Sequence, residues 1–121
     1  MIKLSFCLRR LPHLSREDFQ RYWREQHAPL VAKHAKTLGI LRYVQVHAGH
    51  DALHAGIAAS RGAPAPYDGV AELRFESEAA MAANTSEAAA KAGAELLADE
   101  KKFIDLANSP LWFGDEHVVV G

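Results

Sequence analysis

Hydrophobic positions in this chain recur with a period of two in some segments and about 3.6 in others, and these changes of period mark the expected strands and helices. Residues 2–8 alternate large apolar side chains with Lys, Ser and Cys, which predicts a strand with one strongly apolar face. The segments 40–48 and 67–76 are rich in β-branched and aromatic residues and predict two more strands, and residues 111–120 predict a fourth.

The first helical region follows the first strand. Ser15 is expected to begin it, because its hydroxyl can accept a hydrogen bond from an early helical amide and acidic residues follow in the first turn. Pro29 removes one helical hydrogen bond, so we expect a kink or break just after His27. A second segment from about 30 to 38 then ends at Gly39.

A second helical region is expected over residues 77–106, which are rich in alanine and begin with Ser77 as a cap. Residues 84–86 and Gly93 are the places where this helix is expected to break. Residues 49–66 contain glycine, proline and many alanines without a sustained apolar period, and we interpret them as a long, mobile loop of the kind that forms lids.

The resulting order, βαββαβ, predicts an α+β ferredoxin-like fold in which both helices cover one face of a four-stranded antiparallel sheet. Residues 1–121 are expected to form this single domain. The uncovered face is predicted to carry Cys7, Tyr43, Gln45, His47, Phe75 and Val119. A face this apolar predicts a homodimer with sheet packed against sheet, which gives a dimeric α+β barrel with a pocket in each subunit. This assignment depends on register, because a shift of one residue reverses every side chain.

Composition narrows the partners. The formal net charge is −1, from 14 basic and 15 acidic residues, so no global positive field attracts nucleic acid or anionic lipid. No run of about eighteen apolar residues predicts a membrane span, and the first ten residues do not have the pattern of a signal peptide. The single cysteine, Cys7, suits a reducing compartment, so we expect a cytoplasmic protein whose partner is a small hydrophobic or aromatic ligand.

The densest candidate chemistry lies in the first helix. Phe19, Trp23, His27 and Leu30 follow at intervals of four, four and three, so one imidazole joins an otherwise apolar helix face. From this spacing alone, His27 is either a structural histidine satisfied inside the core or a group that takes part in chemistry.

Three segments together resemble the EthD family of the dimeric α+β barrel superfamily. They are F-C-L-R-R-L-P-H-L-S-R-E-D-F-Q-R-Y-W-R-E-Q-H-A-P-L-V, L-R-Y-V-Q-V-H and Y-D-G-V-A-E-L-R-F-E-S, and the signature Y-W-x-x-x-H-A-P-L is fairly specific. The resemblance weakens over residues 49–66 and in the alanine-rich helix. It implies the barrel fold, whose broader members include cofactor-independent monooxygenases, cyclases, isomerases and dehydratases, but fold-level kinship does not select a reaction.

A pocket lined by His27, His47, Tyr43 and Gln45 would offer a base near neutral pH, a phenol and an amide. In this hypothesis a histidine removes a proton next to a carbonyl, Tyr43 or Gln45 binds the enolate oxygen, and no cofactor is needed. The enolate could also react with dioxygen. Trp23, Gln45, Phe75 and His117 are the candidate substrate-binding residues. In the opposing interpretation Tyr43 and Gln45 are dimer-interface residues.

Other site types receive less support. His47, His50, Asp51 and His54 hold metal-ligating atoms, but their spacing matches no site with a mechanism, so we predict no metal and exposed histidines. Cys7 has no activating neighbour in sequence and is interpreted as a packed thiol. Three classes therefore stay open: a cofactor-free enzyme acting on a small aromatic or cyclic carbonyl compound, in a degradation or polyketide pathway; a non-catalytic accessory protein that binds such a compound; and a dimer without a pocket.

Overall fold

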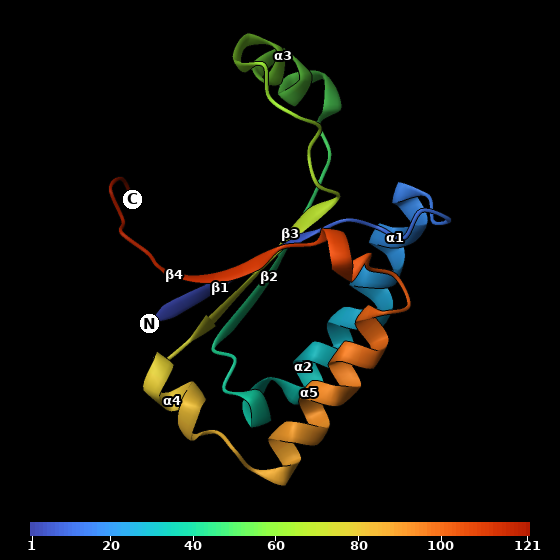
Figure 1. Ribbon diagram of the computed structural model, residues 1–121. Helices are drawn as coiled ribbons and strands as arrows, with labels where there is room; N and C mark the ends of the chain where they lie inside the picture. Colours follow the sequence, from blue (N-terminus) through green and yellow to red (C-terminus); the bar gives the residue numbers. More distant parts are fainter.

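Four strands form one antiparallel sheet in the order β2-β3-β1-β4 in the computed structural model, which describes all residues 1–121 (Figure 1). The strands are β1 (Ile2–Leu8), β2 (Arg42–His47), β3 (Gly69–Phe75) and β4 (Leu111–Asp115). All four match predicted segments, but β4 ends at Asp115, so residues 116–120 extend beyond the sheet. The ferredoxin-like α+β fold is therefore confirmed.

The first helical region forms one long helix with an irregular turn inside it. It consists of α1 (Arg16–Tyr22), the π-helical turn η1 (Trp23–His27) and α2 (Ala28–Leu38). Ser15 caps it as predicted, since its hydroxyl accepts a hydrogen bond from the Asp18 amide at 3.0 Å. Gly39 ends it in the left-handed conformation, with φ 72°. The predicted break after His27 takes the form of the π turn, and the helix continues through Pro29.

The alanine-rich region divides where the sequence predicted, at residues 84–86, into α4 (Glu78–Ala83) and α5 (Glu87–Glu100). Ser77 and Ser86 cap these two helices through bonds of 3.0 and 3.1 Å from the amides of the third residue onward. Gly93 does not interrupt α5. A 3-10 turn, η2 (Leu106–Asn108), leads into β4.

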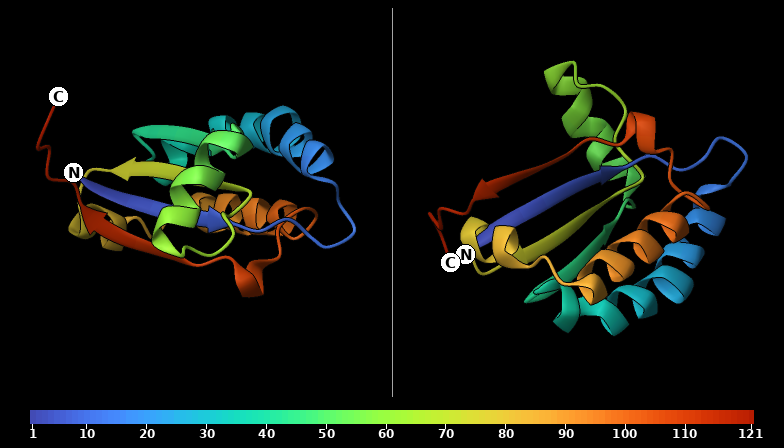
Figure 2. Two further views of the ribbon diagram at one scale, coloured as in Figure 1. Left: turned by 90° about the horizontal axis from the view of Figure 1, so that it is seen from above. Right: turned by 60° about the horizontal axis from the view of Figure 1, so that its bottom comes forward.

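Residues 49–66 do not form the predicted loop, because they contain the helix α3 (Asp51–Arg61). Alanine-rich composition, an acidic first turn, a basic last turn and Gly62 in the left-handed conformation together favour this helix. No residue of α3 is buried, and Leu53 and Ile57 are 69% and 51% exposed. The helix projects from the sheet on the side opposite α2 and α5 (Figures 1 and 2).

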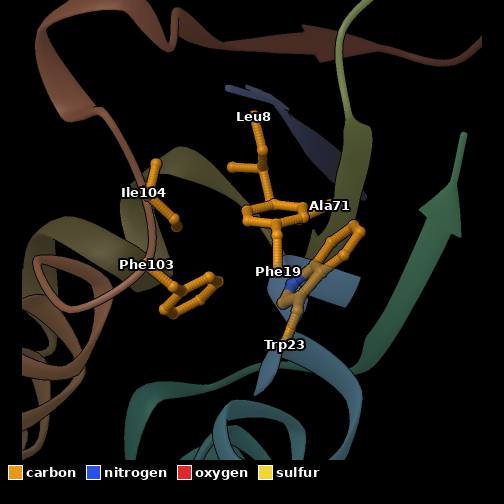
Figure 3. Close-up of a cluster of buried hydrophobic side chains, with 6 residues drawn as sticks. All are labelled: Leu8, Phe19, Trp23, Ala71, Phe103 and Ile104. Atoms are coloured by element: carbon orange, nitrogen blue, oxygen red, sulfur yellow. The ribbon is translucent and has the colours of Figure 1, made fainter. Parts of the chain in front are cut away.

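The hydrophobic core lies between the sheet and the long helix (Figure 3). It consists of Leu8, Phe19, Trp23, Ala71, Phe103 and Ile104. Gly69 allows Trp23 to lie directly against β3, because a Cβ at this position would come within 2.5 Å of the indole ring and 2.7 Å of the Val46 carbonyl oxygen. The close approach therefore requires glycine here.

The register of the sheet corrects the predicted face of β2. Gln45 and Phe6 both pair with Ala71, a core residue, so these three side chains share the helix-facing side. By the same alternation Tyr43, His47 and Phe75 also face the helices, and their predicted place on the uncovered face was wrong. The sequence gave the correct alternation within β2, but alternation alone does not say which of the two faces the helices cover.

The uncovered face instead carries ion pairs at one end and apolar side chains at the other. Lys3 pairs with Glu72 and with Glu116, the latter at 3.1 Å, and Arg74 pairs with Glu116 at 3.1 Å. Cys7, which was predicted on this face, lies there in register with Val70 and Val46, and Trp112 lies beside them on β4. Val119, also predicted there, lies in the exposed segment after β4. No helix of the chain is both long and apolar enough to cross a bilayer.

Candidate functional site

A buried carboxylate joins the long helix to α5. The Asp99 carboxylate accepts hydrogen bonds from the Tyr22 hydroxyl at 2.5 Å and from His27 Nδ1 at 2.7 Å. His27 is 5% exposed and Asp99 is 9% exposed, and the imidazole packs against the Phe103 ring with centroids 5.0 Å apart. Tyr22, Asp99 and His27 thus form a connected polar group at the edge of the core.

The π turn allows Tyr22 and His27 to reach the same carboxylate. Residues five apart in an α-helix are rotated by about 140° from each other, which would direct these two side chains to different neighbours. In the π turn the Ala28 amide instead donates to the Trp23 carbonyl, five residues earlier, so residues at this spacing lie nearly above one another. Both side chains therefore face α5.

Protonation of this group follows from its surroundings. Burial raises the pKa of Asp99, but hydrogen bonds from Tyr22 and His27 outweigh it and the net pKa is lowered. Burial lowers the pKa of His27, and the Asp99 carboxylate offsets part of that effect. Burial, with the bond to Asp99, raises the pKa of Tyr22 to about 12. The imidazole is therefore neutral at pH 7, and since a carboxylate only accepts, the hydrogen is on Nδ1 and Nε2 is a free acceptor.

A second hydrogen-bonded row crosses from η1 to β2. Gln45 Nε2 donates to the Trp23 carbonyl at 2.9 Å and to the Tyr43 hydroxyl oxygen at 2.8 Å. Gln45 Oε1 accepts from His47 Nε2 at 2.8 Å, and the His47 ring stacks on Trp23 with centroids 4.3 Å apart. Burial raises the pKa of Tyr43 and lowers the pKa of His47, so both groups are neutral at pH 7.

Five of the seven predicted site residues therefore lie in these two networks. Trp23 connects them, since it belongs to the second row and lies one helical turn before His27. Phe75 is buried two positions beyond Leu73, the cross-strand partner of Tyr43, and contacts Phe113 with ring centroids 6.0 Å apart. His117 lies in the exposed segment after β4 and joins neither network.

Comparison with known proteins shows the family. Residues 11–107 match the model of the EthD domain. The chain belongs to the EthD family. A search of curated proteins found no match to this EthD protein.

Solved structures similar to this EthD protein span nearly all of it. An ethyl tert-butyl ether D (EthD) family protein from Bacillus halodurans has 18% identity and a TM-score of 0.58, covering 97% of this chain and 100% of that one. HapK from Hahella chejuensis has 14% identity and a TM-score of 0.59, with 100% and 96% covered. An EthD-like protein from Ralstonia eutropha has 18% identity and a TM-score of 0.59, with 98% and 92% covered. Such low identities establish the fold and not an activity.

The pockets of this EthD protein lie elsewhere than the two networks. None of them is lined by His27, Tyr43, Gln45 or His47. The largest, of about 570 Å³, lies between α4 and the adjacent ends of β1 and β4. Phe75 is the one predicted site residue that lines a pocket, a hollow of about 310 Å³ beside α5.

Sequence reasoning missed three residues of the site in the EthD domain: Tyr22, Asp99 and Glu100. The two acids follow in phase with the core-facing positions Ala89, Ala92, Leu96 and Phe103 of the alanine-rich region. An acidic residue at a position where the 3.6-residue period expects an apolar one was the signal that could have indicated them.

The histidines after β2 do not gather around a common point. No group of three or more His, Cys, Asp or Glu side chains is placed to hold a metal ion. His54 pairs with Asp51 at 3.1 Å on the surface of α3, and His47 bonds to Gln45 within the second network. Cys7 is buried on the uncovered face of the sheet, and burial raises the pKa of its thiol, so the thiol is protonated.

Proposed function

We propose that this EthD protein is a small-molecule enzyme that acts on an aromatic or cyclic carbonyl compound by proton transfer, with His27 as the base. The observation that carries the proposal is the His27–Asp99 pair, because it fixes the tautomer that leaves Nε2 unprotonated. A neutral imidazole oriented by a buried carboxylate is an arrangement suited to general base catalysis near neutral pH.

The proposed step needs only side chains. His27 Nε2 takes a proton from the carbon next to the carbonyl, and the electron pair of that C–H bond moves to the carbonyl oxygen to form an enolate. Asp99 stabilises the resulting imidazolium. The Tyr43 hydroxyl accepts a bond from Gln45, so its own hydrogen is free to bind the enolate oxygen. Oxygenation would start from the same enolate with dioxygen as co-reactant, so proton abstraction is common to both reactions.

Replacing His27 with glutamine should abolish proton exchange. Wild-type protein in D₂O should catalyse deuterium incorporation next to the carbonyl of at least one member of a panel of cyclic ketones and acylphenols, followed by proton NMR. The H27Q variant should be slower by about 10²-fold or more, because the base is removed while size and hydrogen bonding are approximately kept.

His34 provides the matched control for this experiment. It forms a similar pair with Glu95 at 2.8 Å between the same two helices, but at the surface. The H34Q variant should exchange at the wild-type rate. If H27Q keeps its exchange rate per folded molecule but loses several degrees of melting temperature, His27 is a core histidine and the proposal is wrong.

One observation favours a second function, that of a non-catalytic protein that binds such a compound for a partner enzyme. The pockets of the chain do not reach His27 or the second network, whereas Phe75 does line one. For this function, ligands of the panel would bind in the pockets near α4 and Phe75, would cause no exchange, and would bind equally well to H27Q.

We also propose that the protein is a homodimer formed through the uncovered face of its sheet. That face has an apolar end, and α3 beside it is an 11-residue helix without any buried residue. Isolated helices of this length are marginal in water, so α3 needs a further surface for its Leu53 and Ile57 side chains. Within the chain, its side chains are tied to the rest by one ion pair, Arg16 to Asp51 at 2.8 Å.

Sedimentation at micromolar concentration should therefore give twice the mass of one chain. Replacing both Leu53 and Ile57 with aspartate should shift the protein to the monomer, because two charges would then lie against the apolar surface of the second copy. Leu97→Asp is the control, since Leu97 is similarly exposed, at 45%, but lies on α5. A monomeric wild type, or equal dissociation of the control, would contradict the proposed interface.

A further inference from the structure

Glu100 occupies a place in α5 where the helix otherwise presents apolar side chains to the core. Ala89, Ala92 and Leu96 precede it and Phe103 follows it at helical spacing. Its carboxyl group is half-buried and makes no hydrogen bond or ion pair, whereas the neighbouring Asp99 is bound by Tyr22, His27 and, at 3.7 Å, Lys102. An unpaired acid at such a position costs stability, and such costs gather at functional sites.

The surroundings keep this carboxyl group protonated over much of the neutral range. Burial, with a smaller contribution from the charge of Asp99, raises the pKa of Glu100 to about 7. The titratable groups on the elements packed around it are Tyr43 and His47 on β2, Tyr22 and His27 on the long helix, and Asp99 with Lys102 at the end of α5. Glu100 lies close enough to Tyr43 for its charge to raise the pKa of that phenol.

We infer that Glu100 is a second catalytic group, and that its protonated carboxyl and the Tyr43 hydroxyl together bind the oxygen of an enolate or phenolate. This inference rests on the proposed function and names its substrate class: compounds whose reacting oxygen becomes anionic. Glutamic acid donates one hydrogen bond when neutral, and none when ionised. Two donors on one oxygen would stabilise the enolate that forms when His27 Nε2 takes the proton from carbon.

Neither donor is sealed inside the core. Glu100 and Tyr43 are both half-buried, and the helix-facing side chains of the edge strand β4, Leu111 and Phe113, are 55% and 47% exposed. The helix-facing side of the sheet is thus fully covered near Trp23 and only partly covered at β4. A planar ring is a suitable occupant, because the side chains around the two donors are mainly aromatic and aliphatic.

Binding of a phenolate tests the inference without a substrate. Pentafluorophenol is acidic enough to be anionic throughout pH 6.5 to 8.5, and fluorine NMR reports its binding directly. Wild type should bind it at pH 6.5 and roughly tenfold or more weakly at pH 8.5, because Glu100 ionises between these values and then repels the anion. His27 does not cause this change, because its pKa lies below 6.5.

Variants at position 100 separate the outcomes. E100Q keeps a donor at every pH, so its binding should stay tight and lose the pH dependence, whereas E100L should bind weakly at both values. E95Q alters an acid on the same helix and should behave as wild type. Absence of saturable binding by wild type at pH 6.5, or wild-type pH dependence in E100Q, overturns the inference. Failure of the exchange assay with phenolate binding intact would overturn the function of His27 instead.

Discussion

Replacing Phe103 with alanine should lower the free energy of unfolding by about 3–5 kcal/mol, the largest loss of stability expected from a single substitution in this chain. Phe103 is fully buried, and its ring centroid lies 5.6 Å from that of Phe19 and 5.0 Å from those of Tyr22 and His27. Truncation would leave a cavity bordered by three rings that are fixed by the helix and cannot easily close it.

Urea denaturation followed by circular dichroism measures this loss. Phe113→Ala is the matched control, because it removes the same atoms from a ring that is 47% exposed and should cost less than half as much. Equal losses in the two variants would show that Phe103 is not the centre of the core. Since Tyr22 and His27 lean on this ring, the alanine variant should also loosen the bonds to Asp99.

Replacing Asp99 with asparagine should reduce proton exchange by about 10²-fold or more, although His27 itself is unchanged. An asparagine amide can donate to His27 Nδ1, which would move the imidazole hydrogen to Nε2 and remove the free acceptor. Because the new side chain cannot accept equally from Tyr22 and His27, stability should fall as well, by about 1.5–3 kcal/mol. Glu95→Gln changes the equivalent surface pair with His34 and is the control; wild-type exchange by D99N would contradict the assigned tautomer.

The pH dependence of stability provides a second measurement on the same variant. The pKa of His27 is lower in the folded than in the unfolded chain, so the unfolded chain binds more protons and stability falls as pH drops below about 6.5. The pKa of Asp99 is also lowered, so its contribution is present above its unfolded value of 3.8 and is lost as pH falls through the folded value. D99N should lack this second, more acidic loss in urea titrations at pH 2 to 8.

Local signals predicted the framework of the fold well. Alternation found the four strands, and the Ser15, Ser77 and Ser86 caps follow from hydroxyl chemistry that acts within three residues. The helix α3 escaped prediction because Asp51–Arg61 has helical propensity but no apolar face that the rest of the chain buries. A pattern search for amphipathic periods cannot find a helix whose supporting surface is absent from the same chain.

The candidate site was only partly visible in the sequence, because its decisive contacts are long-range. His27 stood out by its place on an apolar face, but its partner Asp99 lies 72 residues away, and nothing in either segment specifies that pairing. Tyr43, Gln45 and His47 were found as a group, yet their face was wrong, because the sheet register that places Gln45 beside Ala71 depends on pairing between distant strands.

The π turn gives the long helix a fixed phase that substitutions preserve and deletions do not. It holds one residue more than an α-helical turn, so removing an exposed residue such as Arg24 would restore a regular helix and rotate everything after it by about 100° relative to Phe19. Val31, buried among the packed helices, and the carboxylate-bound imidazole would then compete with Phe19 and Trp23 for the inward direction. Length in this segment is therefore more tightly constrained than the identity of its exposed residues, and a chain shortened there by one would keep its helix but separate the imidazole from its carboxylate.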